Sequence, residues 1–155
     1  MPLTETKIIQ KFVGKFLYYG LAIDNTILVA LNNISLEQSS ATKNTPKKVA
    51  ILLNDLNTNP NASIQYHTSG MILYVHSDAS YMSIKKPRSR TGGIHFLSDA
   101  RPESTYYKTI LPLMNVIIHV VCKILRDFMA SSAEVELGSL FFNAQYAAPI
   151  RTTLI

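Results

Sequence analysis

Apolar side chains recur at three- and four-residue spacing over roughly the first 60 residues, which is the pattern of amphipathic helices. The first predicted helix has its apolar positions at Ile8, Ile9, Phe12, Val13, Phe16 and Leu17. A second helix is expected to begin at Asp24 or Asn25, either of which can cap a helix, and to end near Gln38. A third is expected to begin at Pro46 and to stop before residues 57–61. The N-terminal part is therefore predicted to be helical.

Beyond about residue 60 the pattern changes to short runs rich in β-branched and aromatic residues. Residues 63–67 are compatible with a short strand. Residues 71–81 (MILYVHSDASY) predict a strand that is largely apolar on both faces, as expected at the centre of a sheet. Further strands are predicted at 93–98 and 116–125. The change of pattern marks the one candidate domain boundary.

The last segment has helical spacing again and predicts a helix that begins at Ser131 or Ser132. Glu134 lies in its first turn, near the positive end of the helix dipole. Pro149 is expected to bend or end the helix. Its apolar stripe, typical of a helix that packs on a core, consists of Leu137, Leu140, Phe141 and Ala144. The predicted class is thus α/β (α+β), with N-terminal helices followed by a β-β-β-α unit.

Composition and charge narrow the function classes only slightly. The 155 residues carry a net charge of +5 and a single cysteine, Cys122, which excludes an internal disulfide framework and a cysteine zinc site. The longest apolar run, 110–121, is shorter than the ~20 residues that span a bilayer. The first residues are too polar for a signal peptide. We therefore expect a cytoplasmic or nuclear protein that is not secreted and has no membrane partner.

One dense group of cations interrupts this mild charge distribution. It consists of Lys85, Lys86, Arg88 and Arg90, with Pro87 between them, and this composition predicts a loop. Such a loop can contact phosphates of a nucleic acid, or it can simply be a solvated loop; the residues alone leave both interpretations open.

Asp78 is the candidate with the clearest chemical meaning, because an acid inside an apolar strand is costly unless it is paired or bound to a metal. The alternative is that the strand ends at Ser77 and Asp78 begins a turn. The histidines within the predicted strands, by contrast, are more typical of sheet or core packing than of ligation. They are His76, His95 and His119. Cys122 is expected to be a small buried hydrophobe.

Three motifs follow one another in the second half: SDA at residues 77–79, RSRTG at 88–92 and SAEVE at 132–136. In this order and context they resemble the RNase H domain of copia-type retrotransposon polyproteins. Residues 13–19 (VGKFLYY) are similar to a segment near the end of the reverse transcriptase region of the same polyproteins. The resemblance extends over about residues 8–155.

The resemblance implies a domain organisation for this chain. Residues 1–60 would be a helical segment like the reverse transcriptase thumb and connection, and residues 61–155 an incomplete RNase H-like domain with a truncated β-β-β-α unit. It also implies an activity, the two-metal hydrolysis of the RNA strand in RNA–DNA hybrids by carboxylate-bound Mg²⁺.

The matching catalytic and metal positions are Asp78 and one of the two glutamates of the third motif. Residues two apart on a helix point about 200° apart, so Glu134 and Glu136 do not both face Asp78. Glu136 is chosen because it flanks the apolar stripe around Leu137, and Glu134 is explained by the helix dipole. The predicted site residues are therefore Asp78 and Glu136.

The family also implies a further aspartate beyond the last helix, and residues 1–155 contain no match to it. We therefore expect weak or absent Mg²⁺ binding and little or no nuclease activity from this chain alone, so its status as an enzyme stays open. The alternative function is a nucleic-acid-binding module without chemistry, in which the four cations contact the backbone of an RNA–DNA hybrid or another nucleic acid. Self-association through an open sheet edge is a third expectation.

Overall fold

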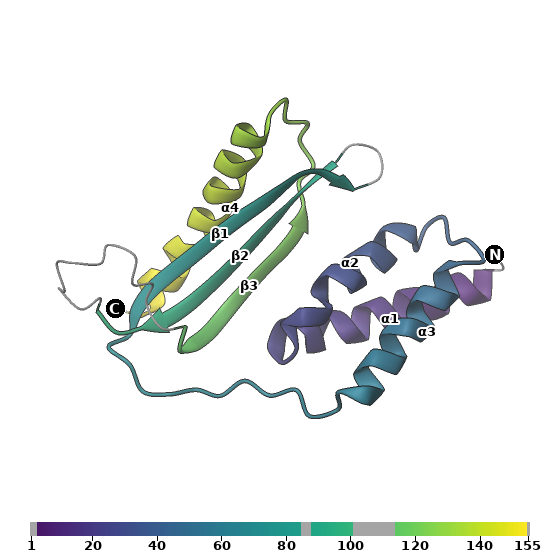
Figure 1. Cartoon of the computed structure of the whole chain (residues 1–155), viewed down its shortest axis with the longest axis horizontal. Helices are drawn as coiled ribbons and strands as arrows, with labels where there is room; N and C mark the ends of the chain where they lie inside the picture. The colour runs from purple at the N-terminus through teal and green to yellow at the C-terminus, as the bar shows by residue number, and fades with distance from the viewer. Residues whose placement is uncertain (1–2, 85–87, 101–113, 155) are drawn as a thin grey trace. The chain divides into compact units, whose positions relative to one another are not determined.

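The computed structural model describes residues 3–84, 88–100 and 114–154, and the side chains of 3–5 and 116 are outside that description. The chain divides into two compact units, Met1–Ile64 and Gln65–Ile155. The described residues form helices in the first unit and a three-stranded antiparallel sheet with one helix in the second (Figure 1). The predicted mixed α+β class is therefore confirmed.

The first unit contains the three predicted helical segments. They are α1 (Leu3–Ala22), α2 (Leu28–Glu37), which is preceded by the 3-10 turn η1 (Asn25–Ile27), and α3 (Thr45–Thr58). Asp24 is the cap that begins η1, because its carboxylate accepts a hydrogen bond from the Thr26 backbone N–H at 3.1 Å. Pro46 lies in the first turn of α3, where its missing N–H costs no intrahelical hydrogen bond.

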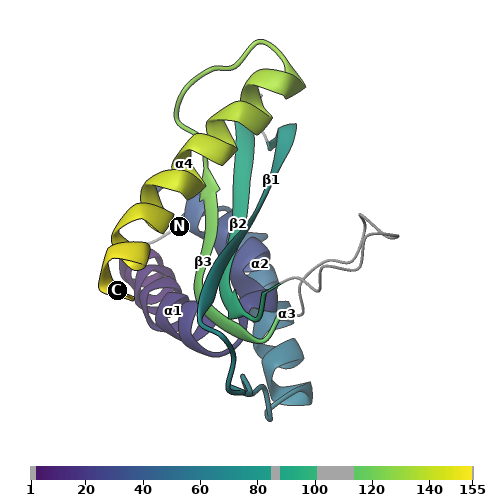
Figure 2. The same cartoon turned by 90° about the vertical axis from the view of Figure 1, so that its left-hand side faces the viewer.

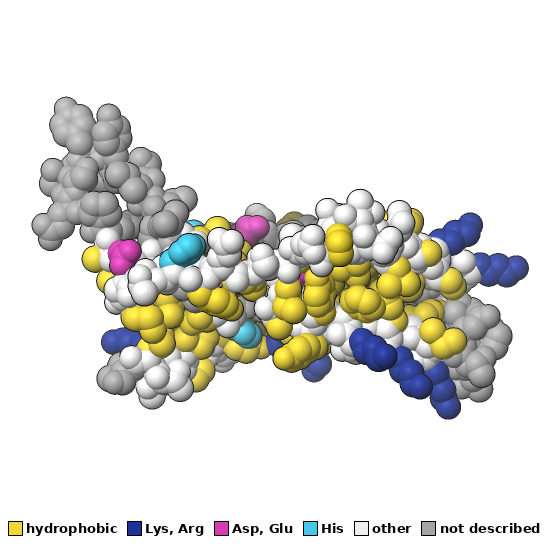
Figure 3. Space-filling view, turned by 90° about the horizontal axis from the view of Figure 1, so that it is seen from below, with side chains coloured by type: hydrophobic (Ala, Val, Ile, Leu, Met, Phe, Trp, Pro, Cys, Tyr) yellow, Lys and Arg dark blue, Asp and Glu magenta, His cyan; other side chains and the backbone are white. Residues whose placement is uncertain are grey.

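The buried core of the helical unit includes two of the apolar positions predicted for the first helix, Ile9 and Val13, whereas Ile8 and Leu17 are exposed. The buried members of this core are Ile9, Val13, Ile27, Leu31, Ile34 and Leu52. A polar contact joins α2 to α3, because the buried Thr45 hydroxyl donates to Glu37 at 2.9 Å and Lys48 pairs with the same carboxylate. Large apolar side chains also remain exposed on these helices, among them Tyr18 and Ile51. Figure 3 shows apolar surface of this kind next to Lys and Arg side chains.

The sheet of the second unit is an antiparallel meander. It consists of β1 (Ile72–Ile84), β2 (Arg88–Ser98) and β3 (Val116–Ile124), in the order β1-β2-β3. The central strand of the described sheet is therefore β2, and the expectation that residues 71–81 form the central strand is wrong for these residues. Two apolar faces do not distinguish a central strand from an edge strand that is covered on both sides.

Two further expectations about strands are corrected. Residues 63–67 adopt no regular structure, and β2 begins at Arg88, well before the predicted start at residue 93. Arg88 and Arg90 therefore belong to a strand, because the pairing of β1 with β2 continues as far as Ile84 opposite Arg88. Lys85, Lys86 and Pro87 lie outside the described residues.

Helix α4 (Ser132–Thr153) lies along one face of the sheet and contacts β1 and β2 (Figure 2). Of the two candidate caps, Ser131 is the one used, since its hydroxyl accepts from the Glu134 backbone N–H at 3.2 Å. Glu134 in turn accepts from the Ala130 backbone N–H at 2.7 Å. Pro149 lies inside the helix, which continues to Thr153, so of the two expected effects, a bend or an end, the end is wrong.

The face by which α4 packs on the sheet differs from the predicted one. Leu137, Leu140 and Phe141 are 67%, 57% and 60% exposed, so the predicted apolar stripe faces away from the sheet. The buried positions are Val135, Ser139 and Asn143, spaced by four residues. Two of these three side chains are polar, and their hydrogen bonds to the strands determine which face of α4 lies on the sheet. A hydrophobic pattern does not reveal such bonds.

A buried polar network joins α4 to the two strands beneath it. The Asn143 side-chain amide donates to the Gly92 carbonyl at 3.0 Å and to the Ser77 hydroxyl at 3.1 Å. The Ser139 hydroxyl lies 2.6 Å from the Thr91 hydroxyl. A Cβ atom on Gly93 would overlap the side chain of Asn143, so the network requires glycine at this position of β2.

We predict that Gly93→Ala destabilises the sheet unit by about 1–3 kcal/mol, the usual range for overpacking a buried site. Gly92→Ala is the matched control on the adjacent residue of β2, where a Cβ atom would meet its nearest neighbour, the Asp78 carbonyl, at 3.9 Å. Hydrogen exchange of the β1 and β2 amides measures the stability of this unit separately from that of the helices. Equal protection factors in the two variants would contradict the prediction.

Candidate functional site

Asp78 lies in the middle of β1, and the strand continues beyond it to Ile84. The alternative in which the strand ends at Ser77 is therefore wrong. The Ser77 hydroxyl lies 3.0 Å from that of Ser139 on α4, so Ser77 faces the helix. Because side chains alternate along a strand, the exposed Asp78 carboxylate projects from the opposite face. His76 lies on that same face, where its ring is 4.9 Å from that of Phe96.

Glu136 lies near the start of α4, and its side chain is exposed. The chain segments that carry the two predicted acids lie against each other, since the Ser139 hydroxyl donates to the Asp78 carbonyl at 2.7 Å and Ser139 is one turn beyond Glu136. Their carboxylates do not converge, because that of Asp78 is on the face of the sheet away from α4. The structure thus brings together the two segments and separates the two functional groups.

This arrangement does not fit a two-metal site. Paired Mg²⁺ ions need several oxygen ligands that surround a shared volume. Within the described part of the chain, no group of three or more His, Cys, Asp or Glu side chains is close enough to hold an ion. Glu134 is engaged at the helix N-terminus, as its predicted role near the helix dipole implies. Asp78 and Glu136 therefore remain candidate ligands from the resemblance alone.

The described arginines of the basic cluster have different surroundings. Arg90 is half-buried opposite Ile124 of β3, and Arg88 is exposed at the start of β2. Arg88 lines a pocket of about 160 Å³ together with Ser89 and residues 125–129, which include Arg126 and Asp127. Arg126 could not be predicted as a neighbour of Arg88, because the two lie 38 residues apart in the sequence and only the pairing of β2 with β3 brings their segments together.

The three strand histidines have separate surroundings as well. His76 packs on Phe96, whereas His95 and His119 lie opposite each other on β2 and β3. Burial lowers the pKa of His119, and the nearby His95 and Lys123 lower it further. The ring of His119 is therefore neutral at physiological pH.

Comparisons of the chain with family models, with curated proteins and with solved structures gave no match. No helix in the described residues is long and apolar enough to cross a membrane.

We predict that Ser139→Ala destabilises the sheet unit by about 1–3 kcal/mol, because it removes the buried hydroxyl that joins α4 to Asp78, Ser77 and Thr91. Asp78 takes part in this contact through its backbone carbonyl, and its side chain is exposed. Asp78→Ala is therefore expected to change the free energy of unfolding by less than about 0.5 kcal/mol. Hydrogen exchange of the β1 amides compares the two. A larger loss in Asp78→Ala would show that the carboxylate has a structural partner.

Proposed function

We propose that the second unit is the β-β-β-α portion of an RNase H-like domain from a retrotransposon polyprotein, and that residues 1–155 alone have little nuclease activity. The observation that carries this proposal is the contact of β1 at Asp78 with α4 one turn after Glu136. It brings the first and third motifs of the resemblance into one place. The antiparallel order β1-β2-β3 followed by a helix that covers one sheet face is compatible with the same proposal.

The expected lack of activity is supported by the directions of the two acids. The carboxylates of Asp78 and Glu136 can share a metal site only if one of them changes its direction. Such a change requires breaking the Ser77–Ser139 contact or rotating the start of α4. In their observed directions, the two carboxylates therefore do not support a hydrolytic step. The first helical segment would correspond to the thumb and connection of the reverse transcriptase.

We predict that purified 1–155 with Mg²⁺ cleaves a labelled RNA–DNA hybrid no faster than its Asp78→Asn variant does. The physical reason is that Asp78 and Glu136 do not share a metal-binding volume. Denaturing gel electrophoresis of the RNA strand measures the cleavage. Mg²⁺-dependent cleavage that Asp78→Asn abolishes would contradict the expected inactivity.

A second candidate function, nucleic-acid binding without chemistry, is favoured by a different observation. Arg88 and Arg126 are exposed, come from separate segments and line one pocket at the end of the sheet. Two guanidinium groups can hold a phosphate through several hydrogen bonds, and Asp127 in the same pocket moderates their charge. Contacts of this kind give affinity that depends on salt and little on base sequence.

We predict that Arg88→Glu combined with Arg126→Glu weakens binding of the chain to an RNA–DNA hybrid at least tenfold at low salt and lowers the salt slope by roughly 2, about one per lost phosphate contact. Lys47→Glu, an exposed charge reversal in the helical unit, is the control and is expected to have a much smaller effect. Fluorescence anisotropy measures both affinities. Unchanged binding in the double variant would exclude this pocket as a nucleic-acid contact.

A further inference from the structure

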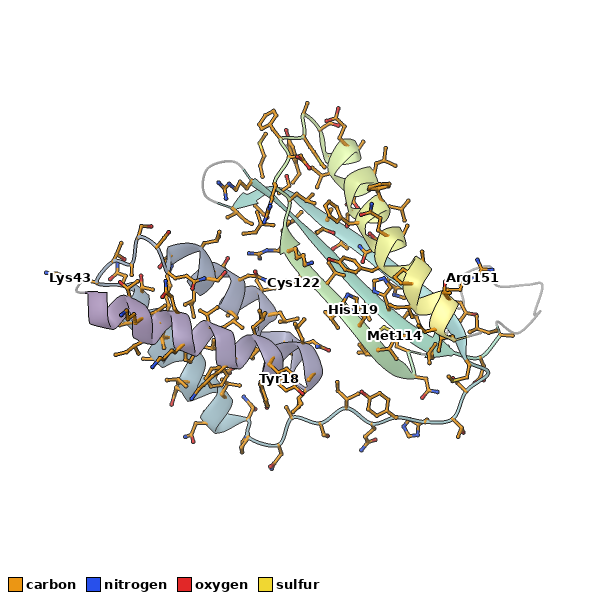
Figure 4. All side chains as sticks on the ribbon, turned by 180° about the vertical axis from the view of Figure 1, so that it is seen from behind. Tyr18, Lys43, Met114, His119, Cys122 and Arg151 are labelled. Atoms are coloured by element: carbon orange, nitrogen blue, oxygen red, sulfur yellow. The ribbon has the colours of Figure 1, made fainter. Side chains whose placement is uncertain are left out.

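His95 and His119 form a pair of imidazoles between the sheet and α4. They are directly opposite each other on β2 and β3, and their ring centres are 5.3 Å apart. His95 is completely buried and contacts α4 through its Nε2 atom, which lies 3.1 Å from the Asn143 carbonyl oxygen. His119 is half-buried on β3, an edge strand of the described sheet (Figure 4). Its ring centre lies 5.0 Å from that of Tyr146.

The hydrogen bond of His95 defines which of its nitrogen atoms can bind a ligand. A carbonyl oxygen only accepts, so Nε2 carries the hydrogen of this bond and Nδ1 is the ring nitrogen left to bind a ligand. Within the described residues, His95 Nδ1 and His119 Nε2 are both buried and have no hydrogen-bond partner. Buried polar atoms without a partner are rare, and one explanation for such an atom is an ion at the site.

We propose that His95 and His119 together bind a transition-metal ion of borderline softness, with water in the remaining coordination positions. Two imidazoles on one tetrahedral ion, with metal–nitrogen bonds of about 2.0–2.1 Å, have their ring centres about 5 Å apart, which agrees with the observed separation. The bond from His95 Nε2 to a backbone carbonyl is the outer contact that usually orients a metal-bound histidine.

The chemistry of the cluster selects the kind of ion. Both proposed ligands are imidazole nitrogens, and the other polar groups of the cluster are the Tyr146 hydroxyl and Lys123, which donates a hydrogen bond to it. Mg²⁺ and Ca²⁺ require oxygen ligands, so these ions are not suited to the site. Imidazole ligands suit Zn²⁺, Ni²⁺ and Cu²⁺. The tetrahedral separation of the rings matches Zn²⁺, and Cu²⁺, which binds most tightly in the series, is the paramagnetic probe of the same two nitrogen atoms. The proposed site therefore differs from the candidate Mg²⁺ site at Asp78 and Glu136 in its ligands and in its ion.

The test is titration of the full chain with Cu²⁺ and, separately, with Mg²⁺, by isothermal calorimetry and by electron paramagnetic resonance. One Cu²⁺ per chain with hyperfine coupling to imidazole nitrogens is expected, and no Mg²⁺ binding at this site. His119→Gln is expected to weaken Cu²⁺ binding by more than about tenfold. Loss of a residue that only supports a metal ligand already weakens metal binding by about tenfold or more, and this variant removes a ligand itself. Because His119 is half-buried, this variant is expected to fold, and circular dichroism verifies it.

Two control variants identify the ligands. His76→Gln removes a histidine on the opposite face of the sheet, and Cys122→Ser removes a thiol that alternation places on the other side of β3 from His119 (Figure 4). Both are expected to keep the Cu²⁺ affinity and the spectrum. Absence of Cu²⁺ binding by the unmodified chain, equal affinity in folded His119→Gln, or loss of binding in either control would overturn the proposal.

Discussion

The position of α4 on the sheet depends on a small buried polar network. Ser139 and Asn143 donate and accept hydrogen bonds between the helix and the first two strands, at Ser77, Thr91 and the Gly92 carbonyl. These bonds form only because Gly93 has no side chain and the Asn143 amide occupies that space. A buried amide or hydroxyl without its partner is costly, so the network admits one rotation of the helix and one register of the strands.

This constraint determines the directions of the functional groups. With Ser77 held toward α4, Asp78 must project from the other face, and Glu136 remains on the exposed part of the helix. The same rotation leaves Leu137 and Phe141 on the outer surface. It also places the backbone carbonyl of Asn143 against His95, which fixes the hydrogen of that ring on Nε2. The acids are thereby separated, while two imidazoles are brought together.

Much of the fold could be predicted from the sequence. The three N-terminal helices, the strands β1 and β3 and the helix α4 lie close to where periodicity and capping residues predict them, whereas β2 begins earlier than predicted and residues 63–67 form no strand. The errors have a common cause. The start of β2 at Arg88 and its central position depend on pairing between strands, and the buried face of α4 depends on hydrogen bonds to the sheet. Neither is a property of a local hydrophobic pattern.

The sequence by itself determined the local elements and the candidate residues, because helix and strand periods, caps and an acid within an apolar run are readable from neighbouring positions. Only the tertiary structure decided which of these residues meet. Arg88 and Arg126 share a pocket, and His95 and His119 face each other, although each pair is widely separated along the chain. Asp78 and Glu136 do not meet, because a hydrogen-bonded network, rather than the apolar stripe, determines which face of α4 lies on the sheet.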